Sequence, residues 1–422
     1  MAEKTTARDM FLRPDHLIRD EVKMYADTLR KFVNEKVLPH EDEFDDLWDW
    51  TERKNTIVHD IFKELWIDHG LQAAQVPAPY GGYDDRTMVE TAALVLEVAR
   101  GDHGLAETGF ISGWAVASTM LPTPNEAIMK KIADGMLKKE PYVICSAISE
   151  PHGGGAVEDI MGLKGAQTRT RARLEGNDWV INGEKLWPSG YREAKAFVVV
   201  CAIEGRKFPD NIAQIWVDTD TPGVSTGKPY RKMGTSIDTN GEIWFENVRV
   251  PKENLLHGGQ DEVNSMLAKE TIGRAMAGSF TLGIMRRAYE VIKAYVDGRE
   301  IGGMPMKNHG AMAHELGQVA SDILAAEMVF WGTLERFDNP EAYGPPWDHK
   351  QLVAASVMDN AVGEYGSKVL NRCVELMGSY GYSKEGKMEK LLRDAKIGQI
   401  VVGGPVLRTL EAARYYFGTQ TV

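Results

Sequence analysis

The order in which hydrophobic periodicity changes along this 422-residue chain constrains its fold more than any other feature. In the first third, apolar residues recur at helical spacing, for example at Ile18, Val22 and Leu29. From Tyr142 onward, short β-branched and aromatic runs alternate with turn residues, a pattern typical of the strands of a small barrel or sandwich. After Pro251 the helical spacing returns and continues to the end.

The chain is too long for one simple core, and these changes divide it into three parts. We expect an α+β fold with a helical N-terminal domain (1–140), a central β-barrel or sandwich domain (141–255) and a C-terminal four-helix bundle (256–422). The strands expected in the central domain are 142–148, 168–174, 179–181, 196–202, 212–217 and 242–245. The segments long enough for extended helices in the last domain are 261–297, 309–337, 348–377 and 387–417.

Composition argues against several classes of partner. The formal charge of -12 argues against nucleic acid or an anionic membrane as a general partner. Cys145, Cys201 and Cys373 lie far apart, without the spacing of a disulfide framework or a metal site, which fits a reducing cytoplasm. No signal-peptide core and no run of about 18 apolar residues occurs, so we expect a cytoplasmic protein without membrane insertion and without a metal.

Two short segments of the central part carry the most specific information. Ile148–Gly155 reads ISEPHGGG and Ile181–Ser189 reads INGEKLWPS. They resemble the T-E-P-x-x-G-S and I-N-G-x-K-x-W-I-T motifs of acyl-CoA dehydrogenases, and the helical–β–helical order is the layout of that family. Because Arg231–Gly234, Phe245–Leu256 and Leu392–Ile397 also resemble family motifs in matching places, the resemblance spans nearly the whole chain.

The resemblance implies an enzyme that oxidises acyl-CoA with FAD. Ser149 and Ser189 would offer hydroxyl and backbone N–H groups to the flavin's O2, O4 and N5 edge, and Trp187 would cover the ring face. For either segment alone, a polar strand end with a buried tryptophan is the alternative. Gly155 and Arg274 would line the acyl-CoA side, although a single helical arginine is usually solvated or ion-paired.

A third motif points to an assembly of subunits. Met377–Tyr382 resembles a glycine signature that lies against the FAD dinucleotide of a neighbouring subunit in this family. Gly378 would let the backbone approach that dinucleotide closely, and Arg299 would meet its pyrophosphate. The residues after Arg299 depart from the family pattern at Gly302 and Gly310. The resemblance implies a homodimer or homotetramer that passes its electrons to an electron-transferring flavoprotein.

The carboxylate base of the family is missing from both of its usual positions. Most members carry a glutamate at the position of Val402, and a minority carry it at the position of Gly273. Neither residue can accept a proton, so Val402 would only contact the substrate. Three explanations remain: a carboxylate elsewhere in the chain, a reaction that needs no α-base, or lost activity.

The segment 99–110 is the best place to search for another base, because it lines the far end of the acyl pocket in the family. Glu107 is the preferred candidate, and Asp102, about one and a half turns earlier, would point elsewhere on the helix. A surface charge or a structural ion pair is the alternative interpretation of Glu107.

A base on that side would reach carbons remote from the thioester. This resembles the variants that oxidise alicyclic acyl-CoA substrates of the cyclohexene-carboxyl type, and Gly273, Gly403 and Gly404 would leave room for a ring. The alternatives are an ordinary short- or branched-chain dehydrogenase with a relocated base, a desulfinase-like enzyme that needs no α-base, and a flavoprotein without enzymatic activity.

Overall fold

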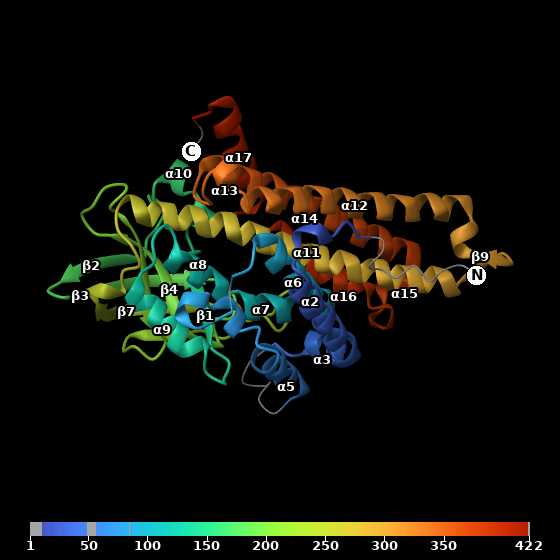
Figure 1. Ribbon diagram of the computed structural model, residues 1–422, viewed down its shortest axis with the longest axis horizontal. Coiled ribbons are helices and arrows are strands. Elements are labelled where there is room, and N and C mark those ends of the chain that lie inside the picture. The colour runs from blue at the N-terminus through green and yellow to red at the C-terminus, as the bar shows by residue number, and fades with distance from the viewer. Residues whose placement is uncertain (1–10, 49–55, 84, 421–422) are drawn as a thin grey trace.

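The computed structural model describes residues 11–48, 56–83 and 85–420. It consists of a group of N-terminal helices, a curled β-sheet and a set of long C-terminal helices (Figure 1). The sheet lies at one end of the long helices, and the small β8–β9 hairpin lies at the other end. In the described part, no helix combines the length and the apolar character needed to cross a membrane.

The N-terminal helices pack around one central helix. They are α2 (Asp20–Phe32), α3 (Glu41–Asp46), α5 (Ile57–Lys63), α6 (Met88–Gly101), α7 (His103–Phe110), α8 (Ser112–Met120) and α9 (Glu126–Met136). Thr87 and Glu90 begin α6 with a capping box, in which each side chain bonds the other residue's backbone N–H. Helix α6 is buried on nearly all sides because it lies between α2 and the first long C-terminal helix.

The central strands form one seven-stranded sheet. The strands are β1 (Val143–Ala147), β2 (Arg171–Glu175), β3 (Asp178–Leu186), β4 (Ala194–Ile203), β5 (Ile212–Asp218), β6 (Val224–Thr226) and β7 (Glu242–Pro251). Their order is β1-β4-β2-β3-β7-β6, and β5 also pairs with β4. Strand β4 runs parallel to β1 and β2, whereas the other pairings are antiparallel. Apolar side chains such as Phe197, Ile215 and Phe245 fill one face of the sheet.

The C-terminal helices are α11 (Gln260–Gly298), α12 (Gly310–Phe337), α14 (His349–Met377), α16 (Met388–Ala395) and α17 (Gly404–Phe417). Helices α11, α12 and α14 lie side by side along most of their length (Figure 1). The hairpin of β8 (Glu300–Ile301) and β9 (Met304–Pro305) connects α11 with α12. Because α11 also packs against α6 and α8, it joins the N-terminal helices to the C-terminal ones.

The expectation of one continuous helix over residues 387–417 is wrong. After α16 the chain makes a short 3-10 turn (Lys396–Gln399), and α17 begins only at Gly404. At the start of α17, Val402, Gly403 and Gly404 have positive φ angles of 52°, 85° and 69°. Left-handed backbone cannot continue a right-handed helix, and Pro405 then occupies the first turn of α17, where proline is tolerated. This break turns Val402 and Gly403 toward the interior.

Two short features were not expected from the sequence. They are β6 and the β8–β9 hairpin, whose strands have two or three residues each. Segments this short carry too little periodicity to be recognised. Neither feature contributes a side chain to the site described below.

The crossing of α11 and α6 makes a test of the packing possible. A Cβ atom on Gly283 of α11 would lie 2.7 Å from Ala99 Cβ and 2.9 Å from the Arg100 backbone nitrogen. We expect Gly283→Ala to lower the free energy of unfolding by about 1–3 kcal/mol, because backbone atoms cannot move aside cheaply. Gly317 on α12 is exposed with no such neighbour, so Gly317→Ala should be neutral or stabilising by about 0.5–1 kcal/mol. Urea unfolding of both variants measures this, and equal midpoints would contradict the close α6–α11 contact.

Candidate active site

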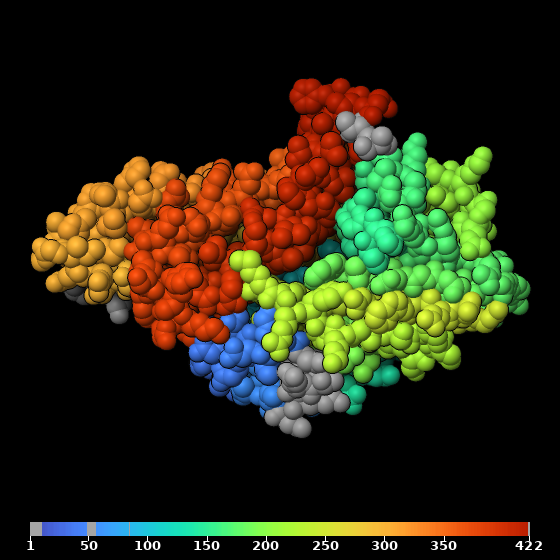
Figure 2. All heavy atoms as spheres, turned by 180° about the vertical axis from the view of Figure 1, so that it is seen from behind, coloured from blue at the N-terminus to red at the C-terminus, as the bar shows by residue number. Residues whose placement is uncertain are grey.

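One large cavity of about 630 Å³ lies where the three parts of the chain meet. Seen from behind, the molecule is hollowed between the red C-terminal segment and the green and yellow-green β domain (Figure 2). The lining is mainly apolar, with polar side chains from several separate elements. These polar residues include His103, Glu107, Ser146, Ser149, Glu158, Ser189, Lys232, Asp238 and Asn240.

The two motifs of the central part meet through a buried ion pair. Lys185 Nζ lies 2.8 Å from Glu150 Oε1 and donates a hydrogen bond to the Ile148 carbonyl oxygen at 2.7 Å. The same carboxylate accepts hydrogen bonds from the backbone N–H groups of Arg169 and Thr170. Burial alone would raise the pKa of Glu150, but the Lys185 ammonium and these N–H groups hold it below its usual range. The glutamate of one motif and the lysine of the other therefore fix the 148–155 loop against β3.

The residues expected to hold a flavin lie together at this cavity. Ser149, Trp187 and Ser189 all line it. Trp187 follows β3 with a positive φ of 65°, and its exposed ring lies against Tyr230 with 4.6 Å between the ring centroids. Ser146 Oγ is buried at the cavity without a hydrogen-bond partner among the described residues. Hydroxyl groups beside an exposed aromatic face fit the polar edge and the flat ring of an isoalloxazine.

Glu107 projects into the cavity from α7. Its Oε1 accepts a hydrogen bond from Ser189 Oγ at 2.8 Å, and its Oε2 has no hydrogen-bond partner within the described ranges. Burial raises the pKa of Glu107, and the opposing effects of Lys232 and of the Ser189 hydrogen bond are smaller. The interpretation of Glu107 as a surface charge is thereby excluded, since only 8% of the residue is exposed.

His103 lies one turn before Glu107 on the same helix. Its Nε2 is 3.5 Å from Glu107 Oε2. Burial lowers the pKa of His103 to about 4, so the imidazole is uncharged at neutral pH and the contact is not an ion pair. Glu107 thus keeps an oxygen atom free to receive a proton.

Asp238 and Lys232 were not recognised as site residues from the sequence. Asp238 Oδ1 accepts a hydrogen bond from the Gly190 N–H at 2.9 Å, and Lys232 Nζ lies 3.5 Å from its Oδ2. Burial and the nearby Glu107 raise the pKa of Asp238 to about 6. The resemblance of Arg231–Gly234 to a family motif does not assign Lys232 to a site, and Asp238 lies in a loop without a pattern of its own. A second carboxyl group and an ammonium therefore adjoin Glu107.

Asp102 caps a helix and pairs with a lysine, and it does not line the cavity. Its Oδ1 caps α7 by accepting a hydrogen bond from the Leu105 N–H, and its Oδ2 lies 2.7 Å from Lys390 Nζ. Lys390 also pairs with Asp394 at 2.6 Å. Both oxygens of Asp102 are thus engaged, and the side chain is directed toward α16 and away from the cavity.

Arg274 also differs from its expected position. Its guanidinium is fully buried and pairs with Glu411 of α17 at 2.7 Å, with a further hydrogen bond to Ser356. It therefore joins α11, α14 and α17, and none of it is exposed for CoA to contact. The ion-paired alternative considered for this arginine is the one observed. Gly155 and Val402, in contrast, do line the cavity.

The expectation that glycines leave room for a ring needs a correction. A Cβ atom on Gly273 would lie 2.4 Å from the Trp114 indole, so this glycine accommodates that tryptophan. A Cβ atom on Gly403 would lie 2.7 Å from Leu407. Gly404 alone has no neighbour within 4 Å of its Cβ position. The width available to a substrate therefore comes from the cavity as a whole.

Arg299 and Gly378 lie at the end of α11 and α14 that is remote from the sheet. Both are exposed, and Gly378 has a φ of 61° with open space around it. The two positions share this end because Tyr295 of α11 stacks on Tyr380, with 5.8 Å between their ring centroids. They therefore lie together, but apart from Ser149 and Trp187 of the same chain.

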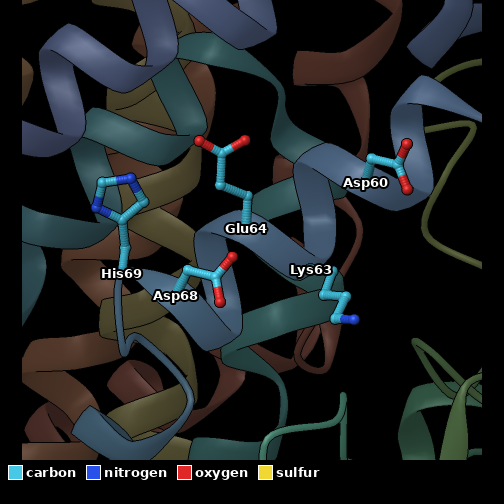
Figure 3. Close-up of a pocket in the computed structure, with 5 residues that line it drawn as sticks. All are labelled: Asp60, Lys63, Glu64, Asp68 and His69. Carbon is cyan, nitrogen blue, oxygen red and sulfur yellow. The ribbon is translucent and has the colours of Figure 1, made fainter.

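A smaller open hollow lies over α5 and the turn that follows it. Asp60, Lys63, Glu64, Asp68 and His69 border it, and their side chains point in different directions (Figure 3). Among the residues that the structure describes, no group of three or more histidine, cysteine, aspartate or glutamate side chains is placed to hold a metal ion. We therefore place no chemistry at this hollow.

Comparisons with known proteins agree with this arrangement. Family models match the acyl-CoA dehydrogenase N-terminal domain at residues 19–140, the middle domain at 145–248 and the C-terminal domain at 263–407. A cyclohexane-1-carbonyl-CoA dehydrogenase of Syntrophus aciditrophicus is 26% identical, covering 94% of this chain and 96% of that protein. The short/branched chain specific acyl-CoA dehydrogenase of Bos taurus is 26% identical over 95% of this chain and 86% of its own length. In fold, butyryl-CoA dehydrogenase from Megasphaera elsdenii matches with a TM-score of 0.80 at 22% identity, covering 94% of this chain and 98% of that one.

The ion pair under the 148–155 loop yields a test of the site's framework. We expect Lys185→Met to lower the free energy of unfolding by about 3–5 kcal/mol, because it leaves the buried Glu150 carboxylate without its counter-ion. Lys293, which pairs with Asp297 on the surface, is the matched control, and Lys293→Met should cost at most about 1 kcal/mol. Denaturant unfolding followed by tryptophan fluorescence measures both variants. Similar losses for the two would show that the buried pair does not hold the loop.

Proposed function

This chain belongs to the acyl-CoA dehydrogenase family of FAD-dependent oxidoreductases that act on acyl-CoA thioesters, and we propose that its own substrate is an alicyclic acyl-CoA of the cyclohexene-carboxyl type. One observation carries this proposal. Glu107 is buried at the cavity with a free carboxylate oxygen. The resemblance to the family implies that Val402 and Gly273 stand at the two positions where a glutamate base is expected. The relative from Syntrophus aciditrophicus supports it, because its name gives a thioester with a saturated ring as substrate.

Bound FAD would supply the acceptor for the two electrons that leave the substrate as a hydride. The chain's own residues would orient the reactants: Ser149 and the backbone at Ser189 would offer donors to the flavin edge, and Trp187 would cover its ring. The Glu107 carboxylate takes the accompanying proton from a ring carbon that is vinylogous to the thioester. Conjugation spreads the developing negative charge to the thioester oxygen. Because burial raises the pKa of Glu107, its carboxylate is a stronger base than one exposed to water.

The assembly belongs to the same proposal. Arg299 and Gly378 are exposed at the end remote from Ser149 and Trp187, so a single chain cannot place all four residues against one dinucleotide. In a homodimer or homotetramer, a second copy of the chain could bring its Arg299 and Gly378 to the dinucleotide that Ser149 and Trp187 of the first copy contact. Phe417 and Tyr416 of α17 are 83% and 69% exposed and offer apolar surface for such contacts.

The remaining expectations concern electron transfer and location. Reduced FAD needs an acceptor, and an electron-transferring flavoprotein is the one that the family resemblance implies. All three cysteines are buried and unpaired, which fits a reducing cytoplasm.

The role of Glu107 is testable by anaerobic flavin reduction. We expect Glu107→Gln to slow the bleaching of enzyme-bound FAD by cyclohexene-carbonyl-CoA by about 10²–10⁴-fold, because the amide cannot accept the proton. Binding of FAD and of the thioester should persist, since glutamine retains the shape of the side chain. Rapid-mixing absorbance measures the rate.

Asp102→Asn is the control, because it removes a carboxylate that pairs with Lys390 and does not face the cavity. Its folded, FAD-bound form should still bleach at the wild-type rate. Unchanged bleaching by Glu107→Gln would eliminate Glu107 as the base.

A further inference from the structure

Glu158 is a buried carboxylate at the cavity besides Glu107 and Asp238, and the proposed function has not used it. It ends the 3-10 turn Gly154–Glu158 that follows the 148–155 loop. Only 9% of the residue is exposed, and its Oε2 has no hydrogen-bond partner among the residues that the structure describes. A buried carboxylate oxygen without a partner is costly, and such groups concentrate at functional sites.

The carboxylate of Glu158 lies beside the turn at Val402 and Gly403. A Cβ atom on Gly403 would be 3.3 Å from Glu158 Oε2, and one on Gly155 would be 3.2 Å from the Gly403 Cα. The loop and the turn are therefore in direct contact. Arg414 of α17 holds them together through an ion pair with Asp159 at 2.7 Å. Glu158 thus places an oxygen next to the position from which most members of the family present their glutamate.

The neighbours of Glu158 decide whether it can act as a base. Glu270, Lys269 and Arg274 face it from α11, and Arg408 faces it from α17. Burial, reinforced by Glu270, raises the pKa of Glu158 to about 8 despite the three cations.

Two of these cations have carboxylate partners of their own. Arg274 pairs with Glu411 at 2.7 Å, and Arg408 lies 2.9 Å from Asp359. Neither arginine is therefore free to hold Glu158 permanently ionised, and Glu158 can exchange a proton near neutral pH.

We propose that Glu158 removes the α-proton of an acyl thioester bound in this cavity, in place of the glutamate that is absent at position 402. The Cα–H bond breaks and its proton passes to Glu158. Its electron pair becomes the Cα=Cβ double bond as the β-hydrogen leaves as hydride to FAD. The products are an α,β-unsaturated thioester, reduced FAD and protonated Glu158.

In this scheme, Glu158 and Glu107 accept protons from two different carbon atoms of one substrate. Glu158 allows the α,β-dehydrogenation of a saturated ring thioester, and Glu107 serves the later removal of hydrogen from the ring. The ring substrate rests on the proposed function, whereas removal of the α-proton by Glu158 does not depend on Glu107.

Exchange of the α-hydrogens with solvent tests Glu158 without flavin reduction. In tert-butylacetyl-CoA the β-carbon carries no hydrogen, so no hydride can leave and only proton transfer is observed. The FAD-loaded enzyme is incubated with this thioester in D2O, and deuterium uptake is measured by mass spectrometry. We expect Glu158→Gln to slow uptake by about 10²–10⁴-fold, and Glu364→Gln, a control at an exposed position of α14, to leave it unchanged.

A rescue variant and a pH profile support this test. Val402→Glu, added to Glu158→Gln, should restore uptake at least about tenfold, because the new carboxylate comes from the adjacent turn. In the wild-type enzyme the rate should rise with pH and level off above about 8, as Glu158 ionises. The pH profile needs no variant to fold.

Four results would overturn the assignment of Glu158. They are wild-type uptake in Glu158→Gln, loss of uptake in Glu364→Gln as great as in Glu158→Gln, no restoration by Val402→Glu, and a rate independent of pH between about 6 and 10, roughly two pH units on either side of a pKa of about 8. The proposed ring chemistry fails separately, when cyclohexene-carbonyl-CoA bleaches the flavin normally in Glu107→Gln.

Discussion

The ion pair between Glu150 and Lys185 is the contact on which the rest of the site depends. It is buried, with side-chain exposures of 2% and 0%, and it fixes a loop rich in glycine that has little secondary structure of its own. That loop carries Ser149 at its start, and the short turn after it ends at Glu158. A glycine-rich loop loses more conformational entropy on ordering than most segments, so it needs a strong contact to stay in one place. Glu150 of one motif and Lys185 of the other therefore have a structural role, because their ion pair holds the two segments together.

Desolvation is the second constraint, because it raises the pKa of both candidate bases. Glu107 and Glu158 are buried at different walls of the cavity, and burial raises the pKa of each. Each also keeps one carboxylate oxygen free of hydrogen bonds within the described part of the chain. A base at either of these two positions would therefore work in the low-polarity environment that makes a carboxylate an effective base.

Much of the fold could be predicted from the sequence, because the spacing of apolar residues indicates where the long helices begin and end. The long helices α11, α12 and α14 have apolar repeats over many turns, and their observed limits lie within a residue or two of those expected. The break before α17 was missed because it arises from three consecutive left-handed residues, of which Val402 is not a residue type that signals a turn.

Only some of the residues at the cavity could be predicted from the sequence. Ser149, Trp187, Ser189 and Glu107 were expected at the cavity and line it, because motifs or helical register fix their positions. Glu158, Asp238 and Lys232 were not expected there, since only the tertiary contact between distant loops brings them to it. Arg274 and Asp102 have charged partners far away in the sequence, Glu411 and Lys390, and no local pattern reveals such pairs.

Exchange at the ring of cyclohexene-carbonyl-CoA in D2O tests most directly whether the proton leaves from a carbon remote from the thioester. The FAD-loaded enzyme is incubated anaerobically with this thioester, and nuclear magnetic resonance locates the deuterium. We predict uptake at the ring carbon vinylogous to the thioester, and none there when Glu107 is replaced by glutamine. Absence of deuterium at that carbon with the wild-type enzyme, or its undiminished uptake without Glu107, would contradict the account.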